Sequence, residues 1–129
     1  MDRLIIIAIV VVAAAVAAVV LFGGGGQNQN PTIVQAGKSA TITLTEYALN
    51  PNRLVMDHGR VKLTVINRGK SIHEFILHDP VLNQDIGKLP FLRPGATEIL
   101  WVDLIAFRRY EMYDSVYKEK GMQGVLNAR

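Results

Sequence analysis

The sequence predicts an all-β Greek-key β-sandwich preceded by one transmembrane helix. Two observations carry this prediction. Residues 4–22 are a run of 19 residues without a single polar side chain. From Pro31 onward, apolar residues alternate with polar ones in short segments that end at Gly, Pro or Asn, the pattern of half-buried strands joined by turns. We therefore expect a transmembrane helix over residues 1–22, a flexible linker over 23–31 and a β-sandwich domain over 32–129.

The apolar run has the length of a membrane span. At ~1.5 Å per residue it reaches roughly 28 Å, close to the ~30 Å hydrocarbon core. A cleaved signal peptide is the alternative, because Ala13-Ala14-Ala15 resembles a small-residue cleavage pattern. A signal h-region spans only ~7–15 residues, so the longer run favours a retained anchor. Arg3 precedes the run and no charge follows until Lys38. This predicts a single-pass protein of the inner (plasma) membrane with a cytoplasmic N-terminus and a periplasmic (extracytoplasmic) domain.

The linker and the strands follow from local composition. Four glycines and the polar run QNQN make residues 23–30 a flexible tether. We expect Trp101 and Tyr110 to be core aromatics and Met112 and Met122 to fill the core. A long loop rich in Pro and Gly is predicted over residues 80–95. Strands are predicted over residues 39–47, 53–56, 61–66, 73–78, 97–102 and 108–113, with a last strand that follows the turn at 121–124 and runs through Leu126.

Five pieces of this domain resemble the cupredoxin family, and they occur in the same order as in that family. They are TEY at 45–47 with the turn at 50–51, VINRG at 65–69 followed by HEF at 73–75, LRPGAT at 92–97, YEMY at 110–113, and GMQG at 121–124. The resemblance spans residues 39–126. It implies a cupredoxin-type Greek-key sandwich, with the last two pieces bracketing what would be the copper-ligand loop.

The resemblance also identifies the positions of the copper ligands. A blue-copper site needs two His, one Cys and usually a weak axial Met. His73 matches the first His and Met122 matches the axial Met, but Asp114 stands where the Cys should follow YEMY, and Tyr117 stands where the second His should lie. The chain contains no cysteine at all, so neither a blue-copper site nor a dinuclear copper centre can form. We expect no cofactor and regard these four positions as vestigial.

A non-blue metal site is the alternative for the same residues. His73 with Asp114, Tyr117 and Met122 would then hold Zn or Cu(II), and the chain would be a periplasmic metal-binding protein. One imidazole and one carboxylate make a weak site without a third strong ligand. We therefore favour a metal-free pocket in which His73 is hydrogen-bonded to Asp114 or Tyr117.

Other function classes find no support in the sequence. Ser71 and Ser115 lack a nucleophile motif, and the glycine run at 23–26 lacks the Lys-Ser/Thr of a phosphate loop. The net charge of +3 forms no basic stripe with interleaved aromatics. We therefore expect no catalytic residues, no enzymatic activity, no small-molecule substrate and no nucleic-acid partner.

Two apolar stretches outside the predicted strands point to contacts. Val81, Leu82, Ile86, Leu89, Phe91 and Leu92 lie in the first, and residues 104–107 form the second. They form either an exposed docking patch or a satellite core over the ends of the sandwich. The expectation is a copper-free accessory subunit of a larger membrane bioenergetic complex, of photosynthetic reaction-centre or respiratory-oxidase type, with other integral membrane subunits as partners.

Overall fold

The structure, a computed structural model, describes residues 33–129. The predicted transmembrane helix over 1–22 and linker over 23–31 therefore lie outside the described residues. Among the residues that are described, no helix is long and apolar enough to cross a bilayer. The one helical element in this range is a short 3₁₀ turn, Lys118–Lys120.

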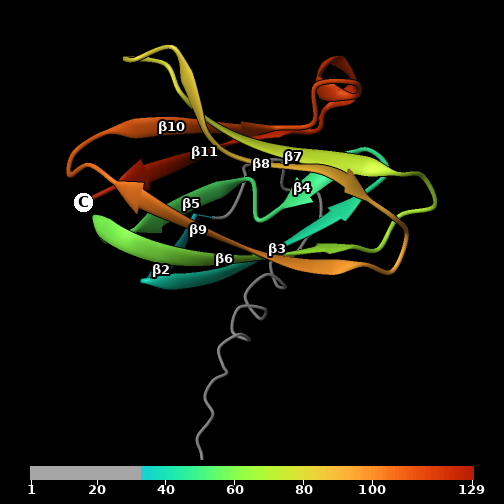
Figure 1. Ribbon diagram of the computed structural model, residues 1–129, viewed down its shortest axis with the longest axis horizontal. Coiled ribbons are helices and arrows are strands. Elements are labelled where there is room, and N and C mark those ends of the chain that lie inside the picture. Colours follow the sequence, from blue (N-terminus) through green and yellow to red (C-terminus); the bar gives the residue numbers. More distant parts are fainter. Residues whose placement is uncertain (1–32) are drawn as a thin grey trace, which may run out of the picture. The chain divides into compact units, whose positions relative to one another are not determined.

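Ten strands form two sheets that lie face to face (Figure 1). The six-stranded sheet has the order β2 (Val34–Gly37), β5 (Arg53–Met56), β11 (Gln123–Ala128), β10 (Arg109–Tyr113), β7 (His73–Asp79) and β8 (Gln84–Leu92). The four-stranded sheet has the order β4 (Ala48–Asn50), β3 (Ser39–Thr45), β6 (Gly59–Asn67) and β9 (Thr97–Leu104).

The chain crosses repeatedly between the sheets. Strand β3 pairs in parallel with β6, and β11 pairs in parallel with β5. Parallel neighbours need crossover connections rather than tight hairpins, and each of these two connections passes through at least one strand of the opposite sheet. The all-β sandwich predicted from the sequence is thus confirmed.

The core follows from the alternation of side chains along each strand. In β3, Ala40, Ile42 and Leu44 are buried between the sheets. In β6, Val61, Leu63 and Val65 are fully buried in the same way. Each such side chain contributes about 1.5–3 kcal/mol when fully buried, so the sandwich has a large apolar source of stability that requires no metal.

Several details differ from the sequence prediction. The predicted loop at 80–95 contains strand β8, whose Pro90 is tolerated because β8 is an edge strand that needs hydrogen-bond donors on one side only. Strands β2, with four residues, and β4, with three, were not predicted. Trp101 is not a core residue: it is 53% exposed and lies opposite Lys62, with the Arg60 guanidinium 5.5 Å from its ring centroid.

The other predicted core residues are confirmed. Tyr110, Met112 and Met122 are all fully buried or nearly so. The Tyr110 hydroxyl also accepts a hydrogen bond of 2.8 Å from the N–H of Ile105, which satisfies the polar group of a buried aromatic side chain.

The two apolar stretches divide between core and surface. Leu89, Leu92 and Leu104 are buried and Ile86 packs against the core. The large apolar side chains left exposed are Val81, Leu82, Phe91, Ile105 and Phe107. The satellite-core alternative therefore holds for the buried members, and docking through the exposed members stays a prediction.

Two phenylalanines provide a matched test of the core. Phe75 is fully buried and Phe107 is 91% exposed. We expect Phe75→Ala to lower the free energy of unfolding by about 3–5 kcal/mol, because it leaves a cavity. Phe107→Ala should change it by less than about 0.5 kcal/mol. Urea unfolding followed by far-UV circular dichroism measures both, and similar losses for the two variants would contradict the placement of these side chains.

Candidate functional site

Four loops meet at one end of the sandwich, which we call the loop end. They join β3 to β4, β6 to β7, β8 to β9, and β10 to β11; the last carries the short 3₁₀ turn (Figure 1). Asn67, fully buried, ties two of these loops together. Its side-chain amide donates to the carbonyls of Ser71 at 2.9 Å and Leu92 at 2.7 Å, while its oxygen accepts from the N–H of Gly69.

His73 and Asp114 lie in direct contact at the loop end. His73 begins β7 and Asp114 follows β10, two neighbouring antiparallel strands. Both side chains are almost completely buried, and Nδ1 of His73 lies 3.1 Å from Oδ2 of Asp114. Because an ionised carboxylate only accepts hydrogen bonds, Nδ1 is the donor. The predicted hydrogen bond between His73 and Asp114 is present in the structure.

Asp114 also binds the backbone on both sides of this contact. Its Oδ2 accepts from the N–H of Glu74 at 3.0 Å. Its Oδ1 accepts from the N–H groups of Val116 at 2.8 Å and Tyr117 at 3.3 Å. An Asp side chain that accepts from residues two and three positions later closes a local turn. One carboxylate thus joins β7 to the first residues of the β10–β11 loop.

The second ring nitrogen of His73 faces another carboxylate. Nε2 is buried without a hydrogen-bond partner and lies 3.5 Å from Oε1 of Glu46, the residue after β3. This separation is an ion-pair distance rather than a good hydrogen bond. The imidazole therefore lies between two carboxylates, with Asp114 on one side and Glu46 on the other.

Glu46 is held mainly by the β6–β7 loop. Its carboxylate accepts from the N–H of Lys70 at 3.0 Å and from the N–H of Ser71 at 2.8 Å. Hydrogen bonding by the Ser71 side chain, followed by the Lys70 N–H, lowers the pKa of Glu46 from 4.5 to about 2. A Cβ at Gly69 would overlap the Glu46 carboxylate, so a larger residue there would displace Glu46 from its present position.

Tyr117 and Met122 complete the set of vestigial positions. The Tyr117 ring packs edge-on against the His73 ring, with centroids 5.2 Å apart, and also contacts Tyr47 at 5.0 Å. Met122 is fully buried within the apolar core. The structure therefore brings His73, Asp114 and Tyr117 into one cluster, with Met122 behind it.

The residues at this site do not fit a blue-copper ion. No thiolate is available, and Tyr117 supplies an aromatic edge where an imidazole would be needed. The Asp114 oxygens already accept four donors. Glu46 lies across the ring from Asp114, so the two carboxylates and the imidazole cannot converge on one ion. Within residues 33–129, no group of three His, Cys, Asp or Glu side chains is arranged to hold a metal.

Glu46 is the member of this cluster that the sequence analysis missed. The only available signal was a carboxylate directly after an alternating strand, which is common in proteins. Its role depends on the β6–β7 loop, 24 to 25 positions later in the chain, and no local pattern reveals a contact over that separation.

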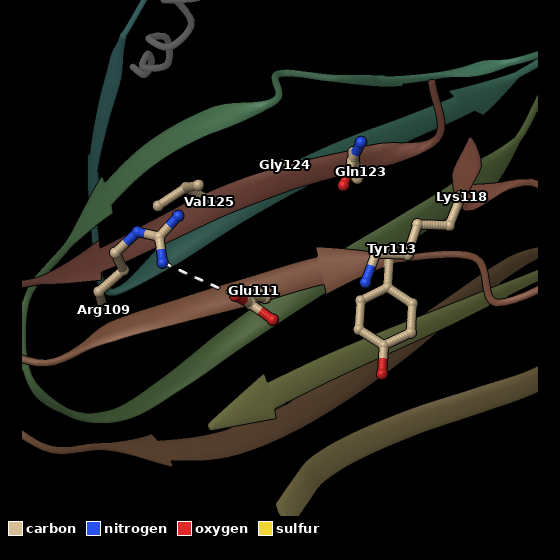
Figure 2. Close-up of a pocket in the computed structure, with 7 residues that line it drawn as sticks. All are labelled: Arg109, Glu111, Tyr113, Lys118, Gln123, Gly124 and Val125. Carbon is tan, nitrogen blue, oxygen red and sulfur yellow. Dashed lines mark ion pairs between the residues drawn. The ribbon is translucent and has the colours of Figure 1, made fainter. Parts of the chain in front are cut away.

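A shallow hollow of about 120 Å³ lies on the outer face of β10 and β11 (Figure 2). Arg109 and Glu111 form an ion pair of 3.6 Å along it, and the Lys118 ammonium lies 4.6 Å from the ring centroid of Tyr113. Burial, followed by the carboxylates of Asp85, Glu111 and Glu74, raises the pKa of Tyr113. Its charged lining residues are Arg109, Glu111 and Lys118, of which the first two form the ion pair, and none of the four vestigial positions lines it.

Comparison with known proteins gives a consistent result for the fold. The profile of the cupredoxin-like domain family matches residues 5–128. None of the curated proteins matches this chain in sequence.

Solved structures of similar fold include copper proteins of photosynthetic bacteria. Dithionite-reduced auracyanin from Roseiflexus castenholzii is 15% identical, with a TM-score of 0.61, covering 71% of this chain and 97% of that chain. Auracyanin A, a "blue" copper protein from the green thermophilic photosynthetic bacterium Chloroflexus aurantiacus, is 17% identical, with a TM-score of 0.61 and coverages of 73% and 100%. The copper-containing nitrite reductase of Thermus scotoductus is 14% identical, with a TM-score of 0.55 and coverages of 70% and 22%. At these identities the likeness shows the fold alone.

Removing the Asp114 carboxylate tests the cluster. We expect Asp114→Ala to lower the free energy of unfolding by about 3–5 kcal/mol, because His73 and three backbone N–H groups lose their acceptor at a buried position. Asp114→Asn, which keeps one acceptor oxygen, should lose less. Asp103→Ala is the control, since its ion pair with Arg60 is exposed and 3.8 Å long. Urea unfolding measures all three, and a loss below about 1 kcal/mol for Asp114→Ala would contradict the assigned role.

The lowered pKa of Glu46 predicts a specific pH dependence. The folded pKa of about 2 lies below the ordinary 4.5, so ionised Glu46 favours the folded state. This contribution is complete above about pH 4.5, decreases as the pH falls, and is lost below about pH 2. We expect the urea midpoint of the unmodified chain to fall more between pH 6 and pH 3 than that of Glu46→Gln. Equal falls would show that Glu46 does not couple protonation to folding.

Proposed function

Because this chain belongs to the family of cupredoxin-like domains, we propose that it is a copper-free, membrane-anchored accessory subunit of a larger membrane complex. In this role the sandwich is a scaffold that stabilises an assembly or docks a component. It carries no electron and performs no catalysis. The anchor is the apolar run at residues 4–22, which would place the domain outside the inner membrane.

The observation that carries this proposal is the buried, hydrogen-bonded carboxylate of Asp114 at the position that the family resemblance assigns to the copper thiolate. A thiolate stabilises cuprous copper and accounts for the chemistry of a blue site. Asp114 instead accepts four hydrogen bonds, one of them from His73. A domain that keeps the sandwich but fills its ligand site with a hydrogen-bonded network retains surface contacts as its means of acting.

The bioenergetic setting is an inference from analogy. Auracyanin A is a "blue" copper protein of a photosynthetic bacterium, and its fold is similar to that of this domain. Fold does not determine function, so the likeness supports the class of complex and identifies no particular one. A photosynthetic reaction centre or a respiratory oxidase is the class of assembly that we propose, with other integral membrane subunits as partners.

Co-purification from native membranes tests the proposal. In mild detergent, we expect the chain to migrate with a set of larger integral membrane proteins, and to remain with them through size-exclusion chromatography. A chain that migrates alone and monomeric under these conditions would contradict the subunit role.

The same purified protein also distinguishes the accessory-subunit role from the alternative role of metal binding through His73. Elemental analysis should give copper and zinc well below one ion per chain, both for the unmodified protein and for His73→Ala. His78→Ala is a matched control, because its imidazole is bonded to Asp85 on the surface. Stoichiometric metal that His73→Ala removes and His78→Ala keeps would favour the metal-binding alternative.

A further inference from the structure

The first described strand is attached to the sandwich less firmly than the others. Strand β2 lies at the edge of the six-stranded sheet, pairs in parallel with β5, and shifts its register between Gln35 and Gly37. Parallel pairing is slightly less stable per residue than antiparallel pairing. Among the ten described strands, β2 is also the one strand without a buried residue. Even β4, which has three residues, buries Leu49.

A few exposed or half-buried contacts hold β2 in place. Val34 and Ala36 are half-buried and pack against the core. Gln35 is exposed, and its side-chain oxygen accepts a hydrogen bond of 3.0 Å from the guanidinium of Arg129. Local opening needs little free energy where few apolar contacts are buried and the hydrogen bonds are exposed to solvent. Strand β2 meets both conditions.

Arg129 holds β2 from a fixed position on the sandwich. Its N–H donates to the carbonyl of Met56 at 2.9 Å, and its own carbonyl accepts from the N–H and the Nδ1 of His58 at 2.9 and 2.8 Å. Its guanidinium donates to Asp57 at 2.9 Å as well as to Gln35. The bond between Arg129 and Gln35 therefore ties β2 to a part of the domain that is fixed independently of β2.

The chain is fixed again directly after β2. The Lys38 ammonium donates to the carbonyl of His58 at 2.6 Å, and the Lys38 carbonyl accepts from the N–H of Lys62 at 2.9 Å. Gly37, the last residue of β2, has a φ of 63°, and a Cβ there would meet nothing within 4 Å. Glycine adopts such a φ at little cost. The turn at Gly37 and Lys38 can therefore change direction while β3 stays in place.

We propose that β2 is a releasable strap, which detaches from β5 as a unit at the Gly37–Lys38 turn while the two sheets stay folded. The N-terminal part of the chain enters the sandwich through this strand. Residues 23–33 lie between the apolar run and β2, and they span at most ~40 Å when extended.

Release of β2 lengthens the connection between the apolar run and the sandwich. The four residues of β2 add ~14 Å to it. The strap thus sets how far the domain reaches from the membrane. In this respect the proposal rests on the membrane-anchored role, whereas release itself is a property of the folded domain.

Hydrogen exchange at two matched backbone amides tests the proposal. The N–H of Asp57 donates to the carbonyl of Gly37 in β2, and the N–H of Lys62 donates to the carbonyl of Lys38, both at 2.9 Å. NMR would follow both amides in the full chain in detergent micelles. We expect the protection factor of Asp57 to be at least about a hundredfold lower than that of Lys62, because release of β2 exposes the first amide and leaves the second bonded.

Removal of the tie to Arg129 makes the test specific. Gln35→Ala should lower the protection factor of Asp57 about fivefold, the equivalent of one net hydrogen bond, and leave that of Lys62 unchanged. Gln84→Ala is the matched control, because Gln84 is exposed on the edge strand β8. It should change both protection factors by less than about twofold.

A disulfide provides the converse variant. Gln35 and Val55 are partners in the pairing of β2 with β5, and the sequence contains no cysteine, so Gln35→Cys with Val55→Cys gives a single possible pair. Its oxidation should raise the protection factor of Asp57 at least about tenfold, and reduction should reverse the change.

Equal protection at Asp57 and Lys62 would overturn the proposal, because β2 would then open only together with the sandwich. An oxidised cysteine pair that leaves Asp57 unchanged would also overturn it, since a different motion would then expose this amide. Equal effects of Gln35→Ala and Gln84→Ala would contradict the role of Arg129. Exchange is measured on the folded domain and the subunit role by co-purification, so failure of the one is distinguishable from failure of the other.

Discussion

The contact between Asp114 and His73 is the constraint on which the loop end depends. Both groups are buried, and a buried carboxylate is tolerated only when its oxygens are occupied by donors. Asp114 meets this requirement by accepting from His73 and from three backbone N–H groups. The beginning of β7 and the β10–β11 loop are fixed relative to each other as a consequence.

Three polar side chains link loops that are distant in sequence. A bound metal ion would link the loops in the same way. Asp114 links β7 to the β10–β11 loop, and Glu46 links the β3–β4 loop to the β6–β7 loop. Asn67 links the β6–β7 loop to the end of β8. These hydrogen bonds differ from metal coordination in one respect. Each side chain bonds to its own partners, so the side chains do not have to point at one common centre. Tyr117 and Glu46 can therefore occupy positions that would exclude an ion.

The sequence alone predicted the sandwich and part of the site. Alternation in residues 39–47 and 61–66 identified β3 and β6 because one face of each strand is buried against the other sheet. Strand β8 was missed because its one proline, Pro90, and its glycine, Gly87, resemble a loop, and the edge position makes the proline acceptable. Trp101 was misplaced because residues 99–102 are all apolar, so their pattern does not reveal which of them face out. The bond between His73 and Asp114 was predictable from the family pattern of ligands, whereas Glu46 was not, since its partners lie in a different loop.

The absence of a thiolate bears on what the loop end has to do. A site that carries electrons has to bring its metal close to a partner's cofactor, so the surface above it must allow close approach between proteins. In the proposed copper-free role, that requirement does not act on the surrounding loops. Those loops display exposed cations, carboxylates and the apolar side chains of Ile72 and Val116. The buried network remains necessary even so, because it holds in one place the four loops on which those cations and apolar side chains are displayed.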